Sequence, residues 1–137
     1  MFDLQGFASS ALAFLVAFIA AGLFTVVFKV IYQWVTPYNE AKLIREGNVA
    51  AALALGGALV GYVLPLASAL SNTVSLVEFC AWAALAGVIQ IAAFSLVRLV
   101  AMKDVAARIE KGEIAAGVYL LSISLAVGLL NAACMTA

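Results

Sequence analysis

Charged residues divide the chain into long apolar stretches. No Asp, Glu, Lys or Arg occurs in residues 4–28, 47–77, 79–97 and 114–137. A helix that crosses the hydrocarbon core of a bilayer needs about 20 predominantly apolar residues, because each residue advances it by about 1.5 Å. All four stretches meet that length, although the third has little to spare. The pattern therefore predicts four membrane-spanning helices, near residues 7–30, 48–70, 78–99 and 114–135.

Composition agrees with a membrane protein. The sequence is 67% hydrophobic and only 10% charged, whereas a soluble domain carries about 25% charged residues. So few charges could not cover a water-facing surface, so most of the surface must contact the lipid bilayer. We expect one all-α integral membrane domain over residues 1–137.

The distribution of cations predicts the orientation. The chain has seven Lys and Arg residues, and all lie in or beside the first or third connection: Lys29, Lys42, Arg45, Arg98, Lys103, Arg108 and Lys111. Cytoplasmic loops of membrane proteins carry the excess of Lys and Arg. We therefore expect both termini on the outer side of a bacterial inner membrane and both charged loops in the cytoplasm.

The composition also disfavours several classes of function. The formal net charge is zero, so nucleic acid is not an expected partner. The sequence has no His, the commonest catalytic base and metal ligand, and we expect no enzymatic activity, cofactor or metal site. Cys80 and Cys134 fall near the outer ends of two predicted helices. They could pair only if their Cα atoms lay within about 7 Å, and two separate thiols are the preferred interpretation.

A weak internal repeat suggests that the chain has two related halves. When the sequence is shifted by 65 residues, Ile44, Gly47, Ala50 and Ala51 coincide with Ile109, Gly112, Ala115 and Ala116 without a gap. Both segments end a charged loop and open an apolar helix. We predict two parallel two-helix repeats, residues 7–71 and 72–137, because a two-helix unit enters the membrane the same way each time. Chance similarity between Ala-rich segments is the alternative.

Several motifs resemble a known family. They are Thr-Pro-Tyr-Asn-Glu (36–40), Ile-Arg-Glu-Gly-Asn-Val-Ala-Ala-Ala (44–52), Gly-Gly-Ala-Leu-Val-Gly-Tyr-Val-Leu-Pro-Leu-Ala-Ser (56–68), Gln90 and Gly-Leu-Leu-Asn-Ala-Ala (128–133). With them, nearly the whole chain resembles the domain-of-unknown-function 350 family, the YjfL-like bacterial inner-membrane proteins. The resemblance implies a four-helix inner-membrane protein with two related halves. It implies no activity, and it carries only an associational link to envelope-stress systems.

Gln90 is an amide placed near the middle of a predicted span, eight residues from Arg98 and twelve from Glu78. An amide in hydrocarbon must find a hydrogen-bond partner, because no water is available there. It could line a pore or solute path. Alternatively it could bond to a neighbouring helix, for example at Ser122 or Ser124.

Two further polar residues lie near the outer ends of predicted spans. Glu78 could attract cations or take part in proton transfer, or it could simply interact with the positive end of a helix dipole. Asn131 could line an outer opening, or it could cap or bridge helices.

The predicted second and fourth helices begin with Gly47-Asn48 and Gly112-Glu113. Free N–H groups at a helix N-terminus suit an anion. Capping by Asn48 and tight turns at the two glycines are the structural alternative.

Small residues recur four apart in three predicted helices, a spacing that lets helix backbones approach closely in lipid. The pairs are Gly57 with Gly61, Ala83 with Gly87, and Ser124 with Gly128. They predict helix contacts, either within one chain or between chains.

Two functions fit these features, of which the first is the preferred interpretation and the second the alternative. The first is a subunit of an oligomeric ion channel or small-solute transporter, in which the pore forms between chains of a homo-oligomer. The second is a non-enzymatic structural or regulatory component, such as a scaffold or anchor of an envelope-stress complex, that docks a protein through loops 31–47 and 99–113. Polar groups that face a common axis would favour the first, whereas polar groups used within one protomer would favour the second.

Overall fold

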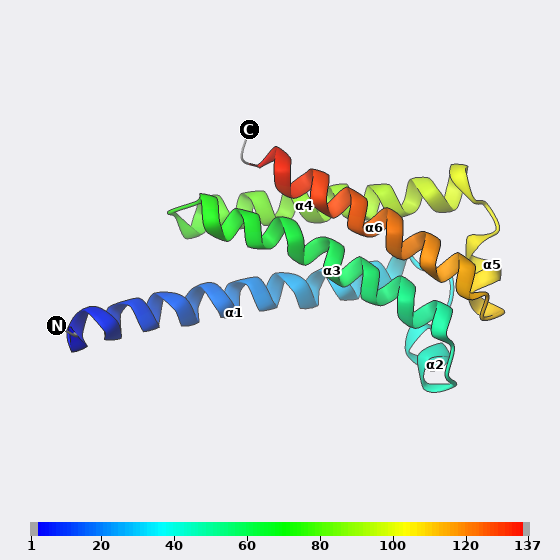
Figure 1. Cartoon of the computed structure of the whole chain (residues 1–137), viewed down its shortest axis with the longest axis horizontal. Helices are drawn as coiled ribbons and strands as arrows, with labels where there is room; N and C mark the ends of the chain where they lie inside the picture. The colour runs from blue at the N-terminus through cyan, green and yellow to red at the C-terminus, as the bar shows by residue number, and fades with distance from the viewer. Residues whose placement is uncertain (1–2, 136–137) are drawn as a thin grey trace.

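The structure, a computed structural model, describes residues 3–135, so the first two and last two residues of the predicted domain lie outside it. All regular structure in this part is helical (Figure 1). The helices are α1 (Leu4–Val35), α2 (Glu40–Arg45), α3 (Val49–Asn72), α4 (Leu76–Leu96), α5 (Val105–Glu110) and α6 (Ile114–Cys134), and α4 continues as a π-helical segment, Val97–Ala101. Four of them, α1, α3, extended α4 and α6, are long and apolar enough to cross a membrane.

The helix ends follow from local sequence chemistry. α1 ends at Val35 because Thr36 precedes a proline, which favours extended backbone at the residue before it, and Thr36 has φ −80° and ψ 136°. α1 is longer at both ends than the predicted span. The Asn48 side chain caps α3 by accepting a hydrogen bond from the Ala51 N–H at 3.0 Å, as is typical of an N-cap asparagine.

The short helices α2 and α5 each end in a turn of the same type. Gly47 and Gly112 have φ of +85° and +80°, a left-handed conformation that only glycine adopts without strain. After α2, the Gly47 and Asn48 N–H groups donate to the carbonyls of Ile44 and Leu43. After α5, the Gly112 and Glu113 N–H groups donate to Ile109 and Arg108. Each turn is a Schellman motif, and the two lie 65 residues apart.

α3 and α6 form the centre of the bundle and run parallel to each other (Figure 1). A Cβ on Gly117 would lie 2.6 Å from the Ala50 carbonyl oxygen near their starts. Near their ends, the Ser68 hydroxyl donates to the Ala132 carbonyl oxygen at 2.9 Å. The two helices therefore stay in contact along most of their length.

Glycines make this close approach possible. A Cβ on Gly57 would lie 2.6 Å from the Leu121 Cα, and a Cβ on Gly61 would collide with the Ser124 carbonyl oxygen. A Cβ on Gly128 would collide with the Gly61 carbonyl oxygen. The first and third small-residue pairs of the sequence thus lie at the α3–α6 contact.

The remaining pair of small residues, Ala83 and Gly87, lies on α4 where this helix contacts α3. Tyr62 of α3 donates its hydroxyl proton to the Ala83 carbonyl oxygen at 2.9 Å. A Cβ on Gly87 would lie 3.4 Å from the Tyr62 ring. Small side chains on α4 therefore make room for one large ring from α3.

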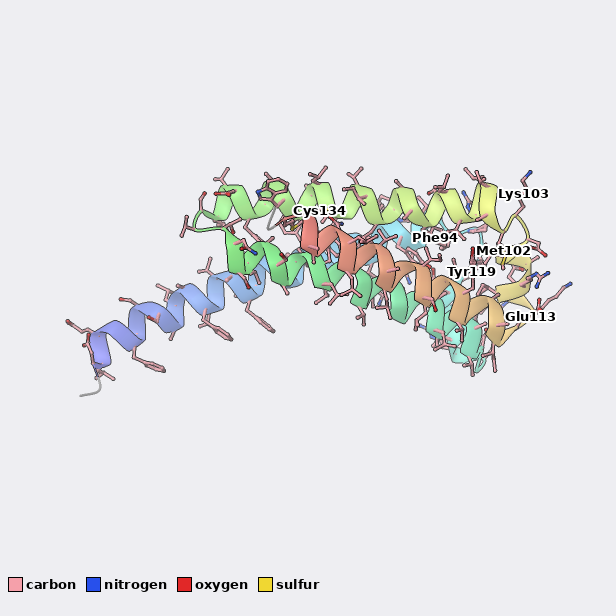
Figure 2. All side chains as sticks on the ribbon, turned by 45° about the horizontal axis from the view of Figure 1, so that its top comes forward. Phe94, Met102, Lys103, Glu113, Tyr119 and Cys134 are labelled. Carbon is pink, nitrogen blue, oxygen red and sulfur yellow. The ribbon has the colours of Figure 1, made fainter. Side chains whose placement is uncertain are left out.

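α1 lies at the side of the bundle and is attached mainly by aromatic rings. Phe28 stacks on Tyr62 with ring centroids 4.3 Å apart. The ring centroids of Tyr32 and of Phe94 in α4 are 4.8 Å apart. Its N-terminal half extends beyond the other helices in both views (Figures 1 and 2). Most of its apolar side chains are therefore exposed.

One end of the bundle carries α2, α5 and the connections around them, residues 36–48 and 102–113, which we call the charged end. Lys103 and Glu113 lie there, and Cys134 lies toward the opposite end (Figure 2). Among the described residues, Asp3 and Glu78 lie near that opposite end, which carries no Lys or Arg.

Candidate functional site

Gln90 is buried inside the protomer. Its side chain is only 5% exposed, and its Nε2 donates to the Ser124 carbonyl oxygen of α6 over a long 3.4 Å. Its Oε1 has no hydrogen-bond partner within residues 3–135. The amide therefore links α4 to the α3–α6 contact, and one of its polar atoms stays unused.

Asn131 makes a similar hydrogen bond, which runs from α6 to α4. It is 8% exposed, and its Nδ2 donates to the Ala86 carbonyl oxygen of α4 at 3.3 Å. Gln90 and Asn131 thus tie α4 and α6 together with two side-chain-to-backbone hydrogen bonds, one from each helix.

Of the other predicted path residues, Ser124 meets this pair only through its backbone carbonyl, and the side chains of Glu78 and Ser122 do not join it. Glu78 and Ser122 are exposed, and Ser124 is half-buried. The Glu78 N–H donates to the Ser75 hydroxyl at 3.3 Å, in the first turn of α4. The Ser122 hydroxyl donates to the Val118 carbonyl of its own helix at 2.8 Å. The structure therefore does not bring these residues to a common surface with Gln90 and Asn131.

The two predicted anion sites at the helix starts differ, because a side chain caps α3 but none caps α6. At α3, the Asn48 side chain accepts from Ala51, and its Nδ2 donates to the Ile109 carbonyl oxygen of α5 at 2.7 Å. At α6, the Glu113 carboxylate lies 3.7 Å from the Arg108 guanidinium. Asn48 thus joins α3 to α5, while the Glu113 side chain pairs with Arg108 and makes no hydrogen bond to the start of α6.

A different group at the charged end is the most unusual polar feature of the structure. Glu40, the first residue of α2, is only 2% exposed. Neither of its carboxylate oxygens has a hydrogen-bond partner among the described residues. The neighbouring Tyr38 hydroxyl is also buried without a partner. A buried charge without a partner is costly, and such a group usually becomes neutral instead.

The surroundings of Glu40 shift its protonation. Burial raises the pKa of its carboxyl to about 7, although the Thr36 hydroxyl and the Lys29 ammonium oppose that rise. The Thr36 hydroxyl donates its own proton to the Gln33 carbonyl at 2.9 Å. Burial, followed by the charge of Glu40, also raises the pKa of Tyr38. The carboxyl of Glu40 therefore gains or loses its proton near neutral pH.

Sequence reasoning did not single out Glu40. The motif Thr-Pro-Tyr-Asn-Glu was informative only as a family resemblance, and the loop charges were interpreted as determinants of topology. A six-residue helix is too short to show an apolar face by periodicity. The sequence shows only that Glu40 follows two tyrosines and a span ended by a proline, and that basic residues come after it. This pattern does not reveal that Glu40 is buried.

The other ionised groups at the charged end lie on the surface. Arg108 Nε lies 2.7 Å from the Asp104 carboxylate, and both side chains are about half exposed. The hydrogen bond from Arg108 lowers the pKa of Asp104, but exposed pairs of this kind contribute little to stability. Cys80 and Cys134 are both free thiols. Within residues 3–135, no three His, Cys, Asp or Glu residues gather closely enough to hold a metal ion.

Comparison with known proteins identifies relatives over almost the whole chain. The family described as Domain of Unknown Function (DUF350) matches residues 3–135. The UPF0719 inner membrane protein YjfL of Escherichia coli strain K12 is 43% identical over 127 residues, which is 93% of this chain and 96% of the relative. The protein of the same name from Escherichia coli O157:H7 matches to the same extent. No solved structure matches the chain.

Proposed function

The chain belongs to the DUF350 family of inner-membrane proteins, and from that premise we propose that it is a non-enzymatic structural or regulatory component of the bacterial inner membrane. In this proposal the helices of each protomer form a closed body. The charged end, with Glu40 inside it, is the part that responds to conditions and contacts partners.

One observation carries the proposal. The two amide side chains buried in the predicted spans, Gln90 and Asn131, both donate to backbone carbonyls of the same chain. Polar groups that served a solute would have to face a shared path instead. Their use within one protomer supports a helix-tying role.

Aromatic rings fill the interior beside these amides. Phe24 packs on Phe79 with ring centroids 5.8 Å apart, and Phe28 packs on Tyr62. Tyr32 and Phe94 continue the series to the charged end. An ion path along α1 and α4 would run over these apolar rings instead of polar groups. The channel or transporter hypothesis therefore requires a path between protomers of a homo-oligomer.

Glu40 supports the regulatory part of the proposal. A carboxyl that titrates near neutral pH changes charge under physiological conditions. It is the first residue of α2, the short helix whose later positions expose Lys42 and Arg45 and whose C-cap is the exposed Glu46. A change in its charge would alter how α2 packs, and thereby how the charged end presents itself to a protein partner.

The orientation is part of the proposal. All seven cations lie at or beside the charged end, which by the distribution of Lys and Arg faces the cytoplasm. In a Cys80→Ser variant, an impermeant thiol reagent added outside the inner membrane should label Cys134, which is exposed. Labelling of Cys134 only after the membrane is broken would reverse the proposed orientation.

We also infer that the two halves arose by duplication. The Schellman turns at Gly47 and Gly112 use equivalent residues 65 positions apart, and each is followed by one of the two central parallel helices. The equivalent hydrogen bonds of the two turns support this inference in addition to the identical residues.

The functional proposal is tested by ion flux through the purified chain in liposomes. We expect no flux of cations or anions above that of empty liposomes, from wild type and from Gln90→Leu and Glu78→Gln run in parallel. Because Gln90 ties α4 to α6, Gln90→Leu should instead lower thermal stability, by about 1 kcal/mol. Wild-type flux that disappears in either variant would establish a conduction path and overturn the proposal.

A further inference from the structure

An apolar groove lies between α1 and α4. Its volume is about 510 Å³, within the range of about 300–1,000 Å³ that is typical of ligand pockets. α1 lines it with residues between Phe24 and Ile31, and α4 lines it with residues between Ala83 and Ala92. Tyr62 contributes the ring that separates the groove from α3. The lining is almost entirely hydrocarbon and aromatic.

The groove exists because α1 and α4 touch at only a few rings. Large rings on α1 face small residues on α4, where Ala84, Gly87 and Ala92 leave space. Both helices are apolar enough to cross the membrane, so the groove lies at the depth of lipid chains. An extended hydrocarbon chain matches this shape and lining.

A cation lies beyond the groove at its charged end. Arg98 follows the lining residue Ile91 by seven residues and lies in the π-helical segment that continues α4, so it is about two turns beyond the groove toward the charged end. Arg98 is half-buried, and its Nε is buried without a hydrogen-bond partner within residues 3–135. Arg98 is also outside both ion pairs found in that part of the chain. An arginine with unused donors matches the geometry of a phosphate group.

We infer that this groove is a binding site for an anionic phospholipid of the surrounding bilayer. One acyl chain lies between α1 and α4, and the phosphate of the headgroup accepts hydrogen bonds from Arg98. The phosphate level is then the charged end, where basic pockets between membrane helices bind anionic headgroups. This site is independent of conduction and of Glu40, so it can fail without affecting the proposed function.

The occupant is a lipid and not a helix from another chain because the two parts of the site require different chemistry. An apolar helix would fill the groove but would leave the Arg98 donors without an acceptor, at a cost for a buried polar group. A zwitterionic lipid carries the same phosphate, but its own ammonium group offsets the attraction to Arg98. An anionic phospholipid therefore satisfies both parts better.

The test is native mass spectrometry of the full chain in detergent with added phosphatidylglycerol or phosphatidylcholine of identical acyl chains. Wild type should retain phosphatidylglycerol preferentially. Arg98→Gln should reduce its retention about tenfold, to the level of phosphatidylcholine, because the attraction between the guanidinium and the net negative headgroup is lost. Ala92→Phe, which fills the groove, should reduce retention of both lipids.

Two control variants separate this site from general lipid contact. Lys103→Gln removes an exposed cation from the same end, and Ala126→Phe adds a ring to the exposed surface of α6; neither should change retention. Equal losses for Arg98→Gln and Lys103→Gln would mean non-specific attraction and would overturn the inference. Unchanged binding of phosphatidylglycerol to an Arg98→Gln variant that elutes and melts like wild type would also overturn the inference. If Arg98→Gln fails to fold, Arg98→Lys keeps the charge and should retain the preference for phosphatidylglycerol.

Discussion

Replacing Gly128 with alanine is expected to destabilise the folded chain by about 2–3 kcal/mol, because a Cβ at this position would collide with the backbone of α3. The obstacle is the Gly61 carbonyl oxygen, a backbone atom of a helix that is itself held on its other faces. It cannot turn aside as a flexible side chain would. The helices must separate along a contact that extends from Ala50 to Ala132. Thermal unfolding in detergent, followed by the fluorescence of Trp34 and Trp82, measures the effect.

Gly56→Ala is the matched control. Gly56 also lies inside α3, but a Cβ there meets no atom within 4 Å. Alanine favours a helix over glycine by up to about 1 kcal/mol, so this variant should be as stable as wild type or slightly more stable. If Gly128→Ala were equally well tolerated, α3 and α6 could not approach as closely as described.

Replacing Glu40 with glutamine is expected to remove a pH dependence of about 3 kcal/mol from the stability of the chain. Its carboxyl has a pKa of about 7 in the folded state, against an ordinary value of 4.5. Because the folded value is raised, the contribution of Glu40 to stability is complete below about pH 4.5. It is lost as the pH rises through 7. Wild type should therefore melt at a lower temperature at pH 8 than at pH 5, and Glu40→Gln should change little between them.

Glu46→Gln serves as the control for Glu40→Gln. Glu46 also belongs to the charged end, just after α2, but its side chain is exposed. The melting temperature of this variant should follow the wild-type curve from pH 5 to pH 8. A Glu40→Gln curve parallel to wild type would show that Glu40 is not responsible for the pH dependence. Wild type that gained stability as the pH rose would contradict the sign of the effect.

Much of the architecture could be predicted from the sequence because the bilayer imposes strong constraints. Charge-free stretches of sufficient length predict helices, and the all-helical structure has four helices that meet this requirement. The resemblance to the DUF350 family is confirmed by the match over residues 3–135, and the inner-membrane location by its relatives. Both orientation and duplication stay predictions.

The candidate site was harder to predict because burial depends on tertiary contacts. Gln90 could be recognised because a polar residue within an apolar stretch is apparent from the sequence alone. Glu40 was not, because the sequence places it in a charged connection where acids are ordinarily hydrated, and only the tertiary packing around α2, which contacts α3, buries it. The choice of partner for Gln90 also depended on the fold, since the acceptor is the backbone of Ser124 and not a side chain.

The most direct measurement is an infrared titration of the Glu40 carboxyl in the full chain in bilayers. Spectra of wild type minus Glu40→Gln isolate the protonated-carboxyl band of this one residue. If the charged end holds a titratable group within an otherwise closed protomer, the band should be present at pH 5.5. It should lose half its intensity near pH 7 and be absent at pH 9. No difference band at pH 5.5 would mean that Glu40 is ionised and hydrated, and would contradict the regulatory role of the charged end.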